Sequence, residues 1–326
     1  MEFLSDYGLF LARTLTILIA TLVLVGAVIA LVRNNQAASP AVGRLTVRHL
    51  NADYERAALT LKSAMLPRKA AKAAARRQRK AEKDHGKKPR RRVFVIDFQG
   101  DLRASAVDSL REEVTAILTA ADPGDEVVVR LESPGGLVPH YGLAAAQLLR
   151  LRDHGLKLTV AVDRMAASGG YMMACVANRV IAAPFAILGS IGVIAQLPNF
   201  NRWLKQHDID YEQYMAGEHK RTVTVFGENT EADREKFQQE IEDTHTLFKD
   251  FVTTHRPHID LEQVATGQHW YGSRAIAHRL ADELRTSDDY LLNASREADL
   301  YHVSCGHRKP LLARLLDRTS AVLARH

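Results

Sequence analysis

The sequence predicts an α/β protein with a largely parallel sheet. Three runs rich in β-branched and apolar residues have the length of strands, Val93–Phe98, Glu126–Leu131 and Leu158–Val162. Helical stretches lie between them, at residues 106–120 and 139–154. Strands that alternate with helices are typical of crossover connections between parallel strands. We therefore expect a crossover fold over this part of the chain.

The N-terminal element is a candidate membrane anchor. Residues 14–32 are nineteen consecutive residues without a charge, and an α-helix of about twenty apolar residues spans the hydrocarbon core of a bilayer. A cleaved signal peptide, the main alternative, has a shorter apolar core of about 7 to 15 residues. We expect residues 1–33 to be a single-pass transmembrane anchor that contacts the lipid bilayer through residues 14–32.

The next segment, residues 34–92, is expected to be a basic helical linker. From Lys62 to Arg92 there are 14 Lys or Arg and two acids. This stretch alone carries more positive charge than the whole chain, whose net charge is +6, so the remaining residues are acidic on balance. A nucleic-acid partner is disfavoured because the basic charge is confined to one segment. An anionic membrane surface and a solvated spacer are both consistent with that charge.

Ser168, in the run Ala166–Tyr171, is the candidate nucleophile. It follows the expected strand that ends at Val162 and precedes an apolar helical stretch, so it lies at a strand-to-helix junction. The start of a helix offers unpaired N–H groups and a positive dipole end to a developing oxyanion. Lys220 is the candidate base, because an unprotonated amine can take the serine proton. A solvated surface lysine is the alternative interpretation of Lys220.

Two further features would complete a Ser-Lys site. The strand ending at Leu131 leads into a glycine turn, from which Gly136, together with Gly169, is expected to donate N–H groups to an oxyanion. Ser190 lies beside Gly189, and its hydroxyl can accept a hydrogen bond from a neutral lysine and fix its direction. For both segments an ordinary turn is the competing interpretation.

Histidine competes with lysine as the base. His140 follows the glycine turn and His219 precedes Lys220, so a Ser-His-Asp arrangement would give the same reaction class. No ordered aspartate completes that alternative in the sequence.

Four motifs in order carry a resemblance to a known family. They are LESPGG at 131–136, ASGGYMMACVA at 167–177, GSIGVIAQLPNFNRWL at 189–204 and GEHKRTVTVFGENT at 217–230. With them, the chain from the anchor to about residue 290 resembles the signal peptide peptidase A family of membrane-anchored serine proteases. The resemblance implies that Ser168 is the nucleophile, Lys220 the general base and Ser190 the residue that orients Lys220.

The family resembles the Clp protease and crotonase folds, which implies repeated strand-strand-helix units and assembly into rings or domes. The resemblance therefore implies a homo-oligomer at the cell inner membrane that cleaves peptides or unfolded proteins and needs no metal or cofactor. We expect a Ser-Lys protease domain at 93–302 and a basic C-terminal tail at 303–326. Ser168 and Lys220 need not meet within a single chain.

Several alternatives stay open from the sequence. The same fold could be a catalytically silent membrane scaffold, or a crotonase-type acyl-CoA enzyme, since paired backbone N–H groups also stabilise a thioester enolate. Arginines that follow the anchor favour a cytoplasmic catalytic domain, whereas relatives are often drawn with it outside, so the side of the membrane is open. Residues 180–197 are uncharged but interrupted by Pro184 and glycines, and we expect a buried core segment with short strands at Val180–Ala182 and Ile191–Ile194 rather than a second span.

Overall fold

The computed structural model describes residues 10, 11, 13–22, 26, 44–67, 69, 70, 72, 73, 76, 90–217 and 220–306. The chain divides into two units. One is the compact unit Leu45–Cys305, and the other consists of residues 1–44 and 306–326. The compact unit is wider than the protease domain expected at 93–302.

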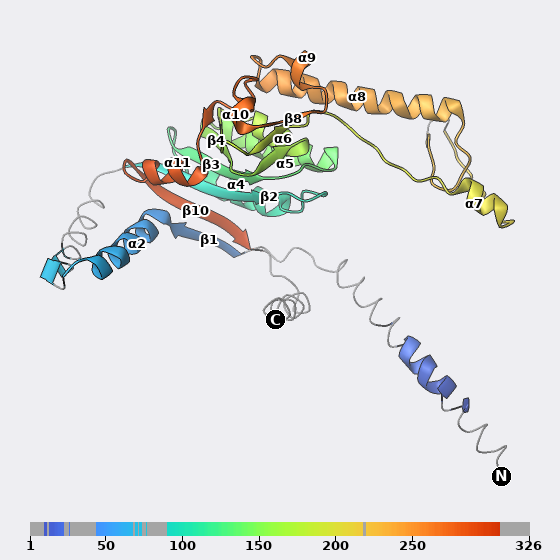
Figure 1. Ribbon diagram of the computed structural model, residues 1–326, viewed down its shortest axis with the longest axis horizontal. Helices are drawn as coiled ribbons and strands as arrows, with labels where there is room; N and C mark the ends of the chain where they lie inside the picture. The colour runs from blue at the N-terminus through green and yellow to red at the C-terminus, as the bar shows by residue number, and fades with distance from the viewer. Residues whose placement is uncertain are drawn as a thin grey trace, which may run out of the picture. The chain divides into compact units, whose positions relative to one another are not determined.

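Seven strands form the main sheet within the described residues, in the order β1-β10-β2-β3-β4-β6-β9 (Figure 1). The strands are β1 (Arg44–His49), β2 (Arg91–Gln99), β3 (Glu126–Glu132), β4 (Lys157–Val162), β6 (Arg179–Ala182), β9 (Glu283–Leu284) and β10 (Ala298–Gly306). From β10 to β9 every neighbouring pair is parallel. The predicted α/β class with a largely parallel sheet is confirmed.

Helices cover both faces of this sheet. On one face lie α4 (Val107–Ala120), α5 (Val138–Asp153) and α6 (Gly169–Cys175), and on the other lie α2 (Leu50–Met65) and α11 (Ser287–Ala294). Strand β2 is buried on both of its faces. Phe94, Ile96 and Phe98 belong to the core under α4 and α5, and Val93 and Val95 belong to the core under α2 and α11. Side chains alternate across a strand, and burial on both faces explains the apolar runs in the sequence.

A second, smaller sheet positions the candidate nucleophile. It is formed by β5 (Met165–Ala167), β7 (Ile187–Gly189) and β8 (His269–Tyr271), with β5 and β7 parallel and β7 and β8 antiparallel. The short helices α9 (Leu261–Val264) and α10 (Gly272–Ala275) flank β8.

The prediction of a buried core segment at 180–197 is correct only for its first part. Residues Val180–Ala182 and Ile191 are buried, but Ile194 and Leu197 are 83% and 47% exposed. The chain is in neither a strand nor a helix from residue 191 to 200, because it leaves the small sheet after β7 and no second layer covers it. A strand expected at Ile191–Ile194 is therefore wrong.

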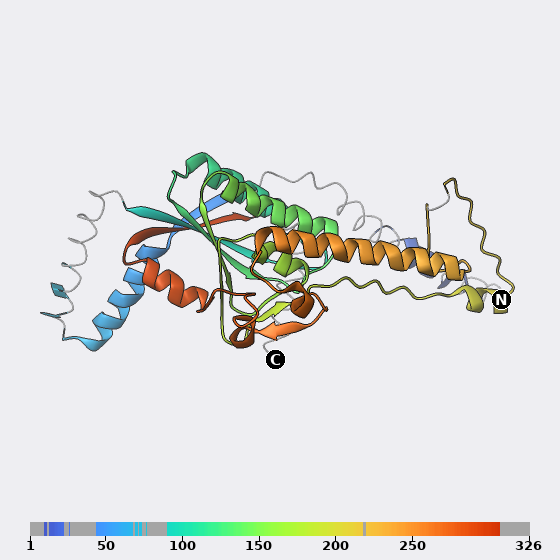
Figure 2. The ribbon, with the colours of Figure 1, turned by 90° about the horizontal axis from the view of Figure 1, so that it is seen from above.

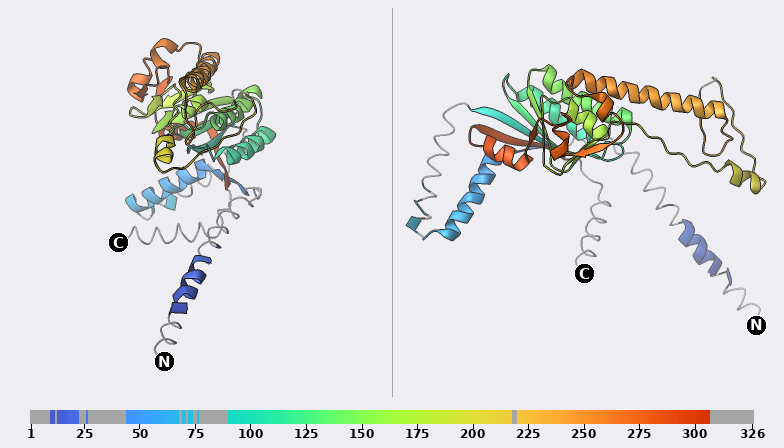
Figure 3. Two further views of the ribbon diagram at one scale, coloured as in Figure 1. Left: turned by 90° about the vertical axis from the view of Figure 1, so that its right-hand side faces the viewer. Right: turned by 45° about the horizontal axis from the view of Figure 1, so that its top comes forward.

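Two helices extend beyond the sheets, α7 (Asn201–Gln206) and α8 (Glu231–His255). A capping box between Thr230 and Asp233 starts α8, and its only buried residues, Phe248 and Val252, lie near its C-terminal end. The views agree that α7 lies beside the start of α8 and away from the main sheet (Figures 2 and 3). We refer to residues 194–240 as the arm.

The predicted anchor and tail fall largely outside the described residues. Of residues 14–32 the structure describes 14–22 and 26, and no helix within the described residues is long and apolar enough to cross a membrane. The tail expected at 303–326 is described only as far as 306, where β10 ends. The predicted linker, 34–92, contributes β1 and α2 to the compact unit, and the Asn51 side chain in α2 accepts from Leu300 N at 2.8 Å.

Candidate active site

Ser168 lies between β5 and α6, as the sequence predicts. Its backbone has φ 52° and ψ −119°, a conformation that non-glycine residues rarely adopt and that is favoured only when surrounding bonds impose it. The Ser168 N–H donates to Gly189 O at 2.8 Å and its carbonyl accepts from Met172 N at 3.0 Å. These two bonds fix the strained turn against β7 and α6.

Ser168 lines a cavity of about 640 Å³ together with Ser190 and Gly136. The other lining residues are Leu102, Pro134, Gly135, Leu137, Val138, Gly192, Val193, Ile194, His245, Ala265, Thr266 and Gly267. Among these residues only His245 has an ionisable side chain. The cavity thus combines a strained serine with mostly apolar walls and several backbone N–H groups.

The glycine turn after β3 lies directly against Ser168. Gly135 has φ +88°, and a Cβ on it would stand 2.7 Å from the Ser168 Cβ. A Cβ on Gly136 would stand 2.2 Å from the Leu102 carbonyl oxygen. Within the described residues no acceptor bonds the Gly136 N–H, so this N–H is available to a bound group in the cavity.

Gly169 is the first residue of α6, directly after Ser168. It is not among the residues that line the cavity, although its N–H has no acceptor in the described part of the chain. A Cβ on Gly169 would stand 2.4 Å from the Tyr141 ring, so the close approach of α5 requires glycine here.

Tyr141 supports the turn from behind, a role that the sequence did not indicate. Its hydroxyl is 2.7 Å from Ser133 Oγ and donates to Asp101 O at 2.8 Å. Ser133 Oγ in turn accepts from Gly135 N at 3.1 Å. Burial raises the pKa of Tyr141, against the opposing effect of the Ser133 hydrogen bond, so the hydroxyl stays protonated and able to donate.

Ser190 is brought into the same cavity as Ser168. It follows β7 with φ 52°, and its N–H donates to Gln268 O at 2.7 Å. Gly189 before it has φ +97°, and a Cβ there would stand 2.9 Å from the Trp270 ring. The turn that carries Ser190 is therefore held by the segment around β8.

The structure does not bring Lys220 to Ser168 within this chain. Lys220 is exposed, lies in the arm between α7 and α8, and is not among the residues that line the Ser168 cavity. The arm is held at its own end, where Phe200 N donates to Val225 O at 2.7 Å.

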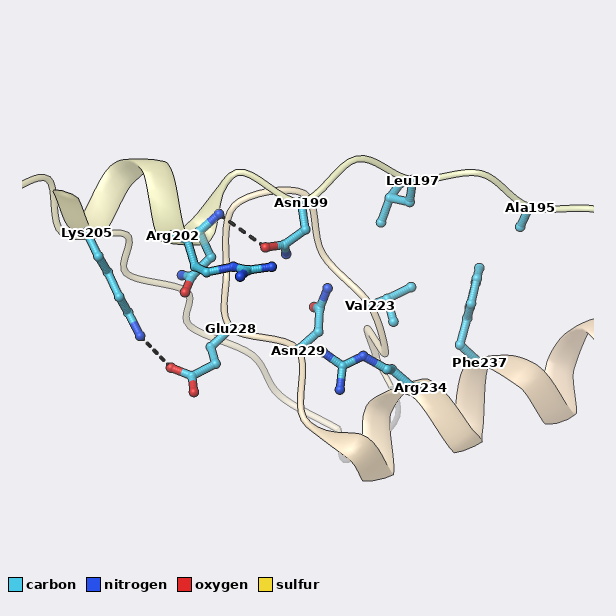
Figure 4. Close-up of a pocket in the computed structure, with 11 residues that line it drawn as sticks. Ala195, Leu197, Asn199, Arg202, Lys205, Val223, Glu228, Asn229, Arg234 and Phe237 are labelled. Atoms are coloured by element: carbon cyan, nitrogen blue, oxygen red, sulfur yellow. Dashed lines mark hydrogen bonds and ion pairs between the residues drawn. The ribbon is translucent and has the colours of Figure 1, made fainter. Parts of the chain in front are cut away.

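The arm also encloses a second cavity, of about 550 Å³. Figure 4 shows Lys205 of α7 paired with Glu228, at 2.6 Å, while Arg202 and Arg234 line the cavity from α7 and α8. Aromatic contacts also hold the arm, because the Phe226 ring lies 6.1 Å from the Phe200 ring and 5.9 Å from the Tyr211 ring, measured between ring centroids.

The histidine at the Ser168 cavity is not one of the two that the sequence suggested as a base. His140 is exposed on α5 and does not line the Ser168 cavity, and His219 lies outside the described residues. His245, on α8, does line the cavity, and its Nε2 atom is buried without a hydrogen-bond partner. His245 lies on a largely polar helix that also carries His255, and nothing in the sequence distinguished it.

The sequence matches two models of one peptidase family. The model for the N-terminal part of peptidase family S49 covers residues 2–148, and the model for peptidase family S49 covers residues 150–301. The chain is 46% identical over 325 residues to the probable protease SohB of Haemophilus influenzae, over 95% of this chain and 91% of that protein. The second model spans Ser168, Ser190 and Lys220.

Two further matches are a curated protein and a solved structure. The probable protease SohB of Buchnera aphidicola subsp. Acyrthosiphon pisum is 51% identical over 228 residues, which are 70% of this chain and 68% of that protein. A solved membrane-bound stomatin-specific protease in complex with a substrate peptide is 12% identical, with a TM-score of 0.41 over 71% of this chain and 100% of that chain.

Proposed function

The chain belongs to peptidase family S49 and is a serine-type peptidase, and on that premise we propose that Ser168 is its nucleophile and Lys220 its general base. The observation that carries the proposal is the strained Ser168, which lines a cavity beside a glycine turn at the start of α6. Non-glycine residues in sparsely populated backbone regions cluster at active sites. We further propose that the protease has the strand-strand-helix units of a Clp- or crotonase-like fold.

The proposed reaction is acyl transfer. Ser168 Oγ attacks the scissile carbonyl carbon while its proton passes to Lys220 Nζ, and the oxyanion accepts bonds from the N–H groups of Gly136 and Gly169. The C–N bond then breaks, and the leaving amine takes the proton from Lys220. Water attacks the resulting ester and gives a proton to Lys220. The bond between Ser168 Oγ and the acyl carbon then breaks, Ser168 Oγ takes this proton from Lys220, and the peptide acid leaves.

Lys220 is proposed to come from a second copy of the chain. In its own chain it lies on the arm, apart from the Ser168 cavity. The arm exposes large apolar side chains, including Ile194 at 83%, Trp203 at 53% and Tyr214 at 88%, and clustered apolar exposure marks interaction surfaces. A homo-oligomer in which one arm covers the cavity of a neighbour would bury these groups and supply the base, with Ser190 orienting the amine.

We propose that residues 14–32 anchor the protease in the cell inner membrane. The support is their length without a charge, which matches the hydrocarbon thickness of a bilayer. Peptides released in the membrane, or unfolded proteins, would then be the substrates. Sedimentation of the full chain with membranes after an alkaline wash tests this placement, and release by the wash would refute it.

The experiment that tests the dyad compares detergent-solubilised wild type with Ser168→Ala and Lys220→Ala. Turnover of an unfolded protein and labelling by a fluorophosphonate are both measured. We expect both variants to lose turnover and Ser168→Ala to lose labelling. Lys205→Ala, an exposed lysine of the same arm, is the matched control and should stay active. Equal turnover in all four proteins would refute the assignment, and folded but silent wild type would favour a membrane scaffold.

A further inference from the structure

Among the described residues, His245 is the only ionisable side chain that lines the Ser168 cavity, and the dyad leaves it without a role. It lies on α8 one turn before Phe248, which is buried in the core. That packing ties the end of α8 to the body of the molecule. His245 is therefore held on a fixed element rather than on a free surface.

The Nε2 atom of His245 has no hydrogen-bond partner within the described part of the chain, although it is buried. A buried polar atom without a partner destabilises the folded protein, and such atoms in native structures call for an explanation. The hydroxyls of Ser168 and Ser190 line the same cavity but make no hydrogen bond with the ring. His245 is thus not paired with the nucleophile as a serine-histidine base would be.

We propose that His245 is a substrate-binding residue, whose Nε2 forms a hydrogen bond with the backbone of a peptide bound beside Ser168. Extended peptides bring unpaired backbone N–H and C=O groups into a site, and among the side chains that line this cavity only His245 and the hydroxyls of Ser168, Ser190 and Thr266 can pair with them. Because Nε2 is buried in the free protein, binding requires the imidazole to rotate about its Cβ–Cγ bond and turn this nitrogen toward the peptide. The free protein then carries an unpaired atom that the bound peptide satisfies.

This proposal deepens the proposed function and names a contact of the same site, but its test does not require turnover. The probe is a fluorescein-labelled peptide rich in leucine and alanine, and its Kd is measured by anisotropy in the full chain with Ser168→Ala. Adding His245→Phe should weaken binding about tenfold, the effect of losing one hydrogen bond of about 1.4 kcal/mol. His245→Gln keeps a polar group and should recover most of the affinity.

Thermal unfolding separates this role from a structural one. His245→Phe removes a buried unpaired atom, so its Tm should equal or exceed that of the parent. His140→Phe, at an exposed histidine outside the cavity, is the control and should change neither Kd nor Tm.

The last measurement is steady-state turnover by proteins that keep Ser168. His245→Phe should raise KM about tenfold with kcat and fluorophosphonate labelling nearly unchanged. An unchanged Kd for His245→Phe would overturn the proposal. A loss of fluorophosphonate labelling with a normal Kd would also overturn it, because His245 would then act as the base. If Ser168 is not the nucleophile, wild type stays unlabelled while the Kd comparison still reports on His245.

Discussion

Gly135 and Ser168 are in direct contact across two different elements. A Cβ on Gly135 would stand 2.7 Å from the Ser168 Cβ and 2.7 Å from the Ala167 carbonyl oxygen. Gly135 also has φ +88°, which side chains rarely adopt. The turn after β3 and the serine turn after β5 therefore form one unit, and neither can move without the other.

We expect Gly135→Ala to abolish fluorophosphonate labelling of Ser168, because the new Cβ must displace the serine backbone. Gly155→Ala is the matched control: it has φ +78°, but nothing lies within 4 Å of its Cβ. It incurs the backbone strain of about 1 kcal/mol alone and should be labelled at the normal rate. Labelling rates and Tm of both variants check this. Normal labelling of Gly135→Ala would show that the contact is unimportant.

Tyr141→Phe should loosen the glycine turn. The substitution removes the hydrogen bonds of the tyrosine hydroxyl to Ser133 and Asp101, which costs about 1–3 kcal/mol of stability. Because Ser133 also holds Gly135 N, we expect turnover to fall more than the loss of stability explains.

Tyr171→Phe is the comparison for that variant. Its buried hydroxyl donates to Leu280 O at 3.1 Å. Removing this hydroxyl should lower the free energy of unfolding by a similar amount without affecting the glycine turn. Urea unfolding and kcat of both proteins are the measurements. Equal kcat values in the two variants would count against a role for Tyr141 in positioning the oxyanion donor.

Mixing of inactive chains tests whether Lys220 acts across subunits. Co-expression of Ser168→Ala with Lys220→Ala places intact Ser168 beside intact Lys220 at some interfaces. Random assembly of a ring should restore about a quarter of wild-type turnover. Each variant expressed alone provides the blank. A mixture no more active than its parts would place both residues of the dyad in the same chain.

The sequence could predict the main sheet because its strands are buried on both faces. Runs such as Val127–Val129 in β3 leave no polar side to confuse the pattern. Ser168 was also predictable, since the change from β-branched residues to an apolar helical stretch marks the junction. Local composition was sufficient in both cases.

The rest of the site depends on contacts that no local pattern contains. Gly135 touches Ser168 across 33 positions of chain, and Tyr141 of α5 donates a hydrogen bond to Asp101 O in the loop before α4. His245 enters the cavity only because the core contact of Phe248 fixes the end of α8. None of the described residues of the arm is buried, so apolar periodicity carried no information on where Lys220 lies.

Glu113 should make stability depend on pH. Burial raises its pKa to about 7, against the opposing effect of the Cys305 N–H that its Oε1 accepts at 2.7 Å. The folded protein thus holds a proton that the unfolded chain releases above about 4.5. The free energy of unfolding should therefore fall as pH rises from about 4.5 to 7, by up to about 3 kcal/mol, and level off above pH 7.

Glu113→Gln keeps the acceptor for Cys305 N but cannot ionise. We expect its free energy of unfolding to lack this decline, so the variant should exceed wild type above pH 7 and match it near pH 4.5. Urea unfolding of both full-length proteins at a series of pH values is the measurement. Glu112→Gln, at the exposed neighbour on the same helix, removes the same charge without burial and should follow the wild-type curve. If the plots of unfolding free energy against pH ran parallel for wild type and Glu113→Gln, the buried carboxyl would ionise in the folded protein with an ordinary pKa.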